Sequence, residues 1–214
     1  MQSVVTTGGI LDYLTVFPDN FSEQASYPLI ICLHGFGADM HDLSGLAPLL
    51  SSTGYLYVLP GAPLFDSNDP TARAWHERGG NESSIAVQEA MAALDGFTTE
   101  VLTRYRVEAG KSLLLGFSQG GAMALRYGLP RPERFAGIAV LSGSLRRVED
   151  LLPNLPPEHT QPIFVAHGRQ DSLVPLEWSR NLITFLEKQG YRPIYKTYPI
   201  DHQISPSLVA DLRN

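Results

Sequence analysis

The sequence has little cysteine and no excess of positive charge. Its one cysteine, Cys32, excludes a disulfide framework within the chain and a zinc cluster built on cysteines. The 16 Lys and Arg residues are outnumbered by 22 Asp and Glu residues, so the chain lacks the excess positive charge that binding to nucleic acid or an anionic membrane surface requires. No apolar run approaches the roughly 18 residues of a membrane-spanning helix, so no integral membrane association is expected.

Targeting and cofactor motifs are also missing. The first residues do not combine a basic segment with an apolar one, so we expect no secretory signal and a soluble cytoplasmic protein. The chain has no H-x-x-x-H, no H-E-x-x-H and no carboxylate cluster of the kind that holds a metal. Its glycine-rich loops lack the lysine of a phosphate-binding loop and the G-x-G-x-x-G motif of a dinucleotide-binding site. We therefore expect chemistry without a metal or another cofactor.

Short apolar segments rich in β-branched and aromatic residues alternate with helical patterns along the whole chain. The predicted strands are Tyr13–Phe17, Leu29–Leu33, Tyr55–Leu59, Ser112–Phe117, Ala136–Leu141, Ile163–Ala166 and Ile194–Tyr198. The predicted helices are Ser83–Tyr105, Gln119–Gly128, Pro175–Gln189 and a short last one that begins at Pro206. Asn81 or Ser83 is the expected cap of the first helix and Ser205 of the last, and Pro60–Glu82 is predicted to be a long loop.

This alternation predicts an α/β fold with a mostly parallel sheet and helices on both faces. A length of 214 residues favours a single domain spanning residues 1–214. Sheets of this kind place their ligand sites at the carboxyl ends of the strands, so the residues that follow the strands are the candidates for chemistry.

The most specific motif is the segment GFSQGG at residues 116–121, which contains G-x-S-x-G. It follows a predicted buried strand and precedes a predicted helix, the setting in which this motif places a serine on a strained turn. The turn needs neighbours without side chains, and Gly116, Gly120 and Gly121 meet that need. The pattern predicts Ser118 as a nucleophile, which requires a base to accept its proton.

Three histidines follow Ser118, and each occupies a different setting. His159 lies in a proline-rich segment, and His167 directly follows a predicted strand, where a structural role is more typical. His202 follows the last predicted strand, in the loop from which a base can reach back over the sheet. We therefore expect His202 to be the general base.

The acid that orients the base is expected to be Asp171, which follows the strand that ends at Ala166. Asp201, Glu149 and Asp150 are the alternatives. Adjacent side chains in an extended segment point to opposite sides, so Asp201 is poorly placed to bond the ring of its neighbour His202.

An acyl-transfer site also needs backbone N–H groups that face the developing negative oxygen. The loop HGFGAD at residues 34–39 follows an early strand, and its glycines let the backbone turn closely. The expected donors are the amides of Phe36 and of Gln119, the residue after the nucleophile. His34 is expected to brace this loop.

These motifs resemble those of the acyl-protein thioesterase and phospholipase/carboxylesterase family of α/β-hydrolases. The matching segments, in the order of the family, are HGFGAD at 34–39, GFSQGG at 116–121, HGRQD with LVP at 167–175, and HQISP at 202–206. The resemblance implies an α/β-hydrolase fold with seven or eight strands and a triad of Ser118, Asp171 and His202. It also implies oxyanion donors at Phe36 and Gln119 and the hydrolysis of carboxylic esters or acyl thioesters.

The sequence departs from the family pattern at two places. Where the family has a tryptophan, an aromatic residue and an aspartate, this chain has Trp75, His76 and Glu77, and the family's glycine before the final histidine is Asp201. The candidates for an apolar acyl pocket are Phe36, Leu64, Phe65, Trp75 and Phe117.

Two other functions share these residues or this fold. An acyltransferase would use the same triad and pass the acyl group to an alcohol, whereas a non-catalytic binding module would typically lack one triad member. A peptidase is a weaker alternative, because no amide-specific subsite is visible. The expected partner is a small acyl ester or thioester, and the sequence does not indicate an oligomeric state.

Overall fold

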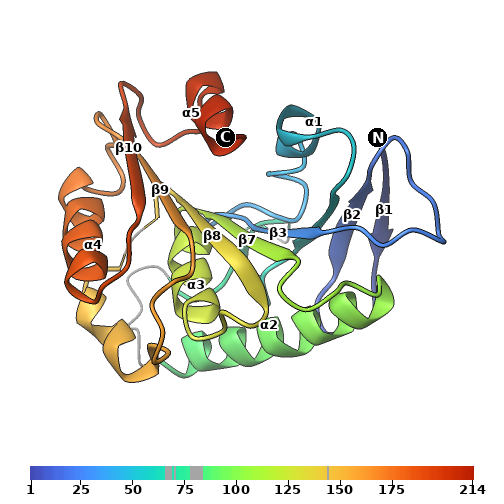
Figure 1. The fold of residues 1–214 in the computed structure, drawn as a ribbon, viewed down its shortest axis with the longest axis horizontal. Coiled ribbons are helices and arrows are strands. Elements are labelled where there is room, and N and C mark those ends of the chain that lie inside the picture. The colour runs from blue at the N-terminus through green and yellow to red at the C-terminus, as the bar shows by residue number, and fades with distance from the viewer. Residues whose placement is uncertain (66–68, 70, 78–83, 144) are drawn as a thin grey trace.

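A mixed sheet forms the centre of the computed structural model, which describes residues 1–65, 69, 71–77, 84–143 and 145–214. Within these residues the sheet has eight strands. Figure 1 shows it with β1 at the right and β10 at the left. Their order is β1 (Gln2–Thr6), β2 (Tyr13–Phe17), β4 (Leu56–Pro60), β3 (Leu29–Leu33), β7 (Ser112–Phe117), β8 (Phe135–Leu141), β9 (Ile163–Gly168) and β10 (Ile194–Tyr198).

The strands from β4 to β10 run parallel, and β1 and β2 are antiparallel to their neighbours. This confirms the predicted mostly parallel sheet. The strand β1 was not predicted, because four of its five residues are exposed and an exposed edge strand carries no apolar pattern. The strand β9 continues past its predicted end to Gly168, which pairs with Tyr198 of β10.

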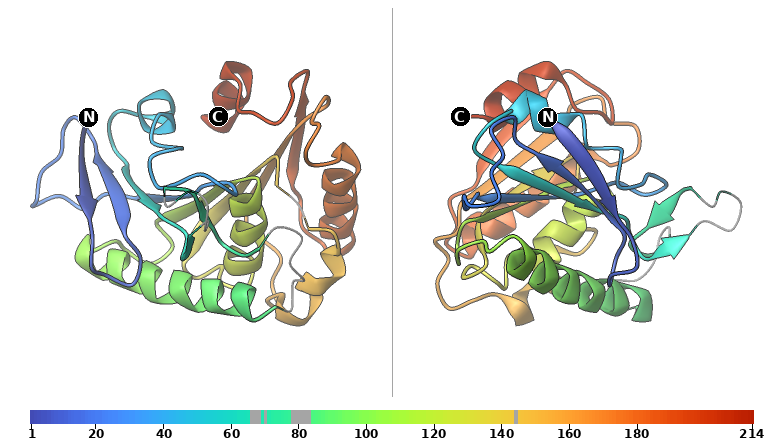
Figure 2. Two further views of the ribbon diagram at one scale, coloured as in Figure 1. Left: turned by 180° about the vertical axis from the view of Figure 1, so that it is seen from behind. Right: turned by 90° about the vertical axis from the view of Figure 1, so that its right-hand side faces the viewer.

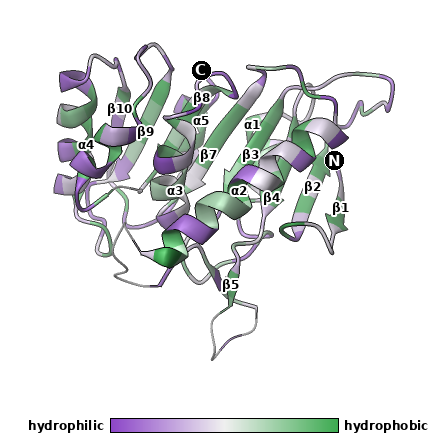
Figure 3. Ribbon diagram, turned by 90° about the horizontal axis from the view of Figure 1, so that it is seen from below, coloured by the Kyte–Doolittle hydropathy of each residue, from purple (hydrophilic) through white to green (hydrophobic). Residues whose placement is uncertain are grey.

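Helices cover both faces of the sheet, as predicted (Figures 1 and 2). One face packs against α2 (Ile85–Arg104), α3 (Gln119–Gly128) and α4 (Leu176–Lys188), and the other packs against the short α1 (Leu46–Leu50) and α5 (Pro206–Leu212). A 3-10 helix spans Val148–Asn154. Figure 3 shows that the strands of the sheet beneath α2, α3 and α4 are largely hydrophobic. The burial of β3, β4 and β7 explains why their sequences read as continuous apolar runs.

Side-chain caps begin the first long helix and the last one. Ser84 accepts a hydrogen bond from the amide of Val87 at 3.3 Å and caps α2, whereas the predicted caps Asn81 and Ser83 lie outside the described residues. Ser205 caps α5 as predicted, through a 3.2 Å bond from Leu208 N.

The segment predicted as a long loop contains two short strands. β5 (Leu64–Phe65) and β6 (Arg73–Ala74) pair in antiparallel orientation, and this hairpin projects from the side of the molecule (Figure 2). Ala38 forms an isolated antiparallel bridge with Arg73, so the hairpin is tied to the loop that follows β3.

The centre of the sheet is a topological switch point. The chain goes from β3 to β4 on one side, while β7 lies on the other side of β3 and leads on to β8. The loops that follow β3 and β7 therefore start side by side at one edge of the sheet, where ligand sites of open parallel sheets lie. A Cβ atom placed on Gly35 would be 3.4 Å from the Cβ atom of Ser118.

Candidate active site

Ser118 occupies a strained turn between β7 and α3. Its backbone has φ 54° and ψ −118°, and its amide donates to the carbonyl of Leu141 at 2.9 Å. A residue with a side chain adopts such a conformation at a cost of about 1–3 kcal/mol, and conformations of this kind cluster at functional sites. The turn holds the side chain of Ser118 half-buried at the carboxyl end of β7.

Glycines next to this turn allow the strand and the helix to approach each other. A Cβ atom on Gly116 would lie 2.1 Å from the carbonyl oxygen of Gly120. A Cβ atom on Gly120 would lie 2.1 Å from the carbonyl oxygen of Leu33. Any side chain at either position would therefore push α3 away from the sheet and change the position of Ser118.

His202 and Asp171 form a hydrogen-bonded pair in the loops that follow β10 and β9. The Nδ1 atom of His202 is 2.8 Å from Oδ2 of Asp171, whose side chain has no exposed surface. The other oxygen, Oδ1, accepts bonds from the amides of Leu173 and Val174 at 3.0 and 2.8 Å. Because a carboxylate can only accept, Nδ1 carries the donated proton and Nε2 of the neutral ring is left to accept one.

The ring of His202 lies beside the turn that carries Ser118. Its centroid is 4.8 Å from that of Phe117, the residue directly before the serine. The structure therefore brings the loop after β10 to the end of β7, although 84 positions separate His202 from Ser118 in the sequence.

His167 braces the loop that carries the acid. It is completely buried, its Nε2 donates to the carbonyl of Val174 at 2.9 Å, and the same nitrogen is 3.4 Å from Oδ2 of Asp171. His159 lies elsewhere, stacked on Tyr191 with 4.7 Å between the ring centroids. Of the three histidines that follow Ser118, His202 is the one that contacts Phe117.

The alternative acids have other partners. Oδ1 of Asp201 accepts from the amide and the hydroxyl of Ser172, at 2.8 and 2.9 Å, and from the backbone amide of His202. Glu149 and Asp150 belong to the 3-10 helix, where Asp150 forms an ion pair with Arg147.

The loop after β3 is held on both sides by hydrogen bonds. Gly37, with φ 78°, donates to the carbonyl of Arg73 at 2.9 Å, and Arg73 N donates to Ala38 O at 2.8 Å. His34 donates from Nδ1 to the carbonyl of Gly35 at 2.8 Å and accepts from Ala62 N at Nε2. Burial lowers the pKa of His34, which favours the neutral ring that this pattern requires.

The side chain of Gln119 makes contacts that the sequence did not predict. The amide oxygen accepts from the backbone of Trp75 at 2.9 Å, and Nε2 donates to the carbonyl of His76 at 2.8 Å. This side chain thus ties the start of α3 to the segment after β6. A polar residue at the start of α3 is the only signal in the sequence, and it does not specify these partners.

Trp75 has a different environment from the one expected for a pocket wall. Its side chain is completely buried, and its indole nitrogen donates to the carbonyl of His34 at 3.0 Å. The indole therefore supports the loop after β3 from the core and offers no accessible surface to a ligand. Burial lowers the pKa of the adjacent His76.

Two cavities contain the other predicted pocket residues. One of about 220 Å³ is lined by Phe36, Leu64 and Phe65 together with Glu77. The other, of about 570 Å³, lies between α1 and α5 and includes Phe117 and His202. The predicted pocket residues thus do not line a single cavity. Phe36, Leu64 and Phe65 lie beside the loop after β3, whereas Phe117 lies beside His202.

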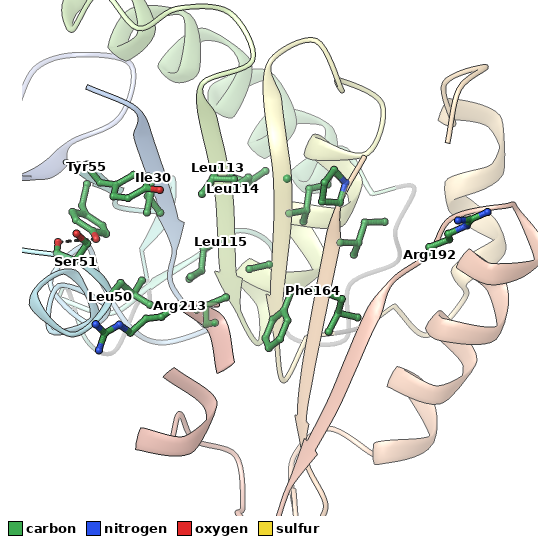
Figure 4. A pocket seen from close by; sticks show the side chains of 18 residues that line it. Ile30, Leu50, Ser51, Tyr55, Leu113, Leu114, Leu115, Phe164, Arg192 and Arg213 are labelled. Carbon is green, nitrogen blue, oxygen red and sulfur yellow. Dashed lines mark hydrogen bonds between the residues drawn. The ribbon is translucent and has the colours of Figure 1, made fainter. Parts of the chain in front are cut away.

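A third cavity, of about 290 Å³, lies on the sheet face that carries α1 and α5 (Figure 4). Its walls include Ile30, Leu113 and Phe164, which belong to the amino-terminal halves of their strands. The cavity is therefore remote from the carboxyl ends of the strands, where Ser118 lies.

The described residues offer neither a metal site nor a membrane-spanning helix. Among them, no group of three or more His, Cys, Asp or Glu side chains is arranged to hold a metal ion. No helix in the described part of the chain has the length and apolar character needed to span a bilayer.

The arrangement of the sheet and of these loops is the α/β-hydrolase fold. In that fold a serine on the strand-to-helix turn is followed along the chain by an acid and then by a histidine. Ser118, Asp171 and His202 follow β7, β9 and β10 in that order.

Comparisons with known proteins agree with this fold. Residues 20–214 match the model of the phospholipase/carboxylesterase family. An acyl-protein thioesterase 1 of Mycosarcoma maydis is 29% identical over 206 residues, which are 84% of this chain and 86% of that protein. Carboxylesterase SOBER1 of Arabidopsis thaliana is 30% identical over 170 residues, 73% of this chain and 72% of that protein. The crystal structure of esterase PE8 has a TM-score of 0.79 at 25% identity, over 93% of this chain and 94% of that one.

The chain belongs to the phospholipase/carboxylesterase family of α/β-hydrolases and is a carboxylic ester hydrolase.

Proposed function

We propose that this protein hydrolyses carboxylic esters and acyl thioesters through an acyl-enzyme intermediate, with Ser118, Asp171 and His202 as the triad. The observation that carries the proposal is the 2.8 Å bond from Nδ1 of His202 to the buried Asp171, beside a serine with φ 54°. The bond holds the imidazole in the tautomer whose Nε2 can accept a proton. The turn exposes the Ser118 hydroxyl, which would donate that proton.

In the first half of the reaction, the Ser118 hydroxyl attacks the carbonyl carbon while His202 Nε2 accepts the proton. The oxyanion that forms is stabilised by the amides of Phe36 and Gln119. The imidazolium then protonates the departing alkoxide or thiolate, and the acyl group remains on Ser118. In the second half, a water molecule attacks the acyl carbon while His202 Nε2 accepts its proton, and His202 then returns the proton to the Ser118 oxygen as the carboxylic acid leaves.

We propose that the acyl group occupies the cavity of about 220 Å³ next to Phe36. Leu64 and Phe65 supply its apolar surface, and Arg73 lies over the Phe65 ring at 3.7 Å from its centroid. A cavity of this size favours short- to medium-chain acyl groups. The names of the relatives include both thioesterase and carboxylesterase, which supports testing both kinds of bond over a graded series of chain lengths.

Covalent labelling and turnover of a p-nitrophenyl ester test the mechanism together. A fluorophosphonate probe is expected to label the wild-type protein and not the Ser118→Ala variant. Ser118→Ala and His202→Ala should each lower kcat by several orders of magnitude. His159→Ala is the matched control, because His159 packs on Tyr191 away from Phe117, and it should retain activity.

Two outcomes would contradict the proposal. Unlabelled wild-type protein would indicate a binding module on this fold, and full turnover by His202→Ala would remove His202 from the reaction. Product analysis with an added alcohol identifies an acyltransferase, which would form a new ester in place of the free acid.

A further inference from the structure

The loops that carry the acid and the base are joined to each other beyond the ends of their strands. The parallel pairing of β9 with β10 ends at Gly168 and Tyr198. Arg169 N then donates to Tyr198 O at 2.7 Å, and Gln170 N donates to Ile200 O at 3.0 Å. The two loops are in close contact, because a Cβ atom on Gly168 would lie 2.4 Å from the carbonyl oxygen of Ile200.

The side chain of Asp201 connects the two loops next to the acid and the base. Oδ1 of Asp201 accepts three hydrogen bonds: from Ser172 N at 2.8 Å, from Ser172 Oγ at 2.9 Å and from His202 N at 2.8 Å. Ser172 directly follows Asp171, and Asp201 directly precedes His202. One carboxylate oxygen therefore links the immediate neighbours of the acid and the base.

We propose that Asp201 is a positioning residue, whose carboxylate holds the loop of Asp171 against the loop of His202 so that the ring stays in register with the acid. The proposal rests on the triad proposed above. Asp201 itself does not bond the imidazole ring, which is bonded by Asp171. Its effect is geometric, and displacements of about 1 Å in a catalytic group can reduce a rate about 100-fold.

A carboxylate is the group best suited to this position. Its oxygens can only accept, and all three partners of Oδ1 are donors. Bonds to an ionised acceptor are shorter and stronger than bonds to a neutral one. The hydrogen bonds from Ser172 and the amide of His202 lower the pKa of Asp201, so it is ionised at neutral pH. Asparagine at this position would keep one acceptor oxygen and lose the charge.

The test uses Asp201→Asn, Asp201→Ala, Ser172→Ala and the Asp201→Ala/Ser172→Ala double variant. We expect kcat to fall about tenfold in Asp201→Ala and less in Asp201→Asn, with KM little changed in both. Ser172→Ala removes one of the three bonds and should have a smaller effect. The double variant should resemble Asp201→Ala, because the two side chains act through one contact. Asp19→Asn, which removes an exposed charge near the N-terminus, is the control and should leave kcat and KM unchanged.

The outcomes separate this proposal from the triad itself. If wild-type protein is labelled by the fluorophosphonate while the Asp201 variants match it in kcat, the positioning role is overturned. A loss of activity that only follows a loss of folded protein, with the folded fraction as active as the wild-type protein, would show a merely structural role and would also overturn it. If wild-type protein is not labelled, the triad proposal fails. Thermal unfolding of each variant shows whether it has folded.

Discussion

At the scale of single residues, the protonation pattern of one histidine decides what the site can do. His202 is held through Nδ1 by Asp171, whose second oxygen is bound by two backbone amides. That carboxylate is fully enclosed, whereas Asp201 is exposed and turned toward Ser172. The two aspartates thus have different roles, although they lie in the adjacent loops that follow β9 and β10. Only Asp171 can set the tautomer of the ring.

The first prediction concerns this tautomer. In Asp171→Asn the amide can donate a hydrogen bond to Nδ1, which favours the ring form with its proton on Nε2. That form cannot accept the proton of Ser118, so kcat for ester hydrolysis should fall about 10⁴-fold. Steady-state kinetics on a p-nitrophenyl ester measure the loss. A greater loss in Asp201→Asn than in Asp171→Asn would show that the two roles have been assigned the wrong way round.

At the scale of secondary-structure elements, the site depends on how closely α3 approaches β3 and β7. Gly120 lies at the start of α3, and its Cα faces the carbonyl groups of Leu33 and His34. Backbone atoms cannot move aside as a flexible side chain can, so the close contact sets where Ser118 stands relative to the loop after β3. Gly121 is packed in a similar way against Gly143.

The second prediction follows from this packing. Gly120→Ala would place a Cβ atom 2.1 Å from Leu33 O, so it should lower the free energy of unfolding by about 3 kcal/mol and reduce activity. Gly45→Ala is the matched control, because its Cβ atom meets nothing within 4 Å and its φ is −63°. The control should be neutral or slightly stabilising. Chemical denaturation of both variants measures the difference, and equal stabilities would contradict the packing argument.

At the scale of the whole molecule, the protein should be sensitive to acid. His34 is buried under Trp75 and accepts the amide of Ala62, so it must remain neutral in the folded state. Burial lowers its pKa below the ordinary value of 6.5, and the same cause lowers the pKa of His76. The unfolded chain therefore binds these protons more readily than the folded one.

The third prediction gives the direction of this pH dependence. The contribution of His34 to stability is fully present above about pH 6.5 and is lost as the pH falls below the unfolded value. For a single group the loss has a slope of at most about 1.4 kcal/mol per pH unit. Urea unfolding of wild-type protein and of His34→Gln between about pH 7 and pH 5 measures the difference in slope. A slope that is the same in both proteins would exclude His34 as a source of acid sensitivity.

Much of the fold was predictable because its signals are local. The strands β2, β3, β7 and β10 and the helix α3 have their predicted bounds. Strands buried on both faces need continuous apolar residues, and a helix ends where glycine and proline follow. The edge strand β1 and the β5–β6 hairpin escaped prediction, since pairing with distant backbone stabilises them more than their own composition does.

The amino-acid order was sufficient to predict the strand–serine–helix turn, the glycines around it and the chain order of the candidate acid and base. The turn and its glycines depend on residues a few positions apart, for which steric rules act directly, and the candidate acid and base each follow a predicted strand. Only the folded chain decided that Gln119 holds the segment after β6, that Trp75 is buried, and that Asp201 bonds Ser172. Those contacts join residues 29 to 44 positions apart, and their partners become neighbours only when the strands pair and bring distant loops to one edge of the sheet.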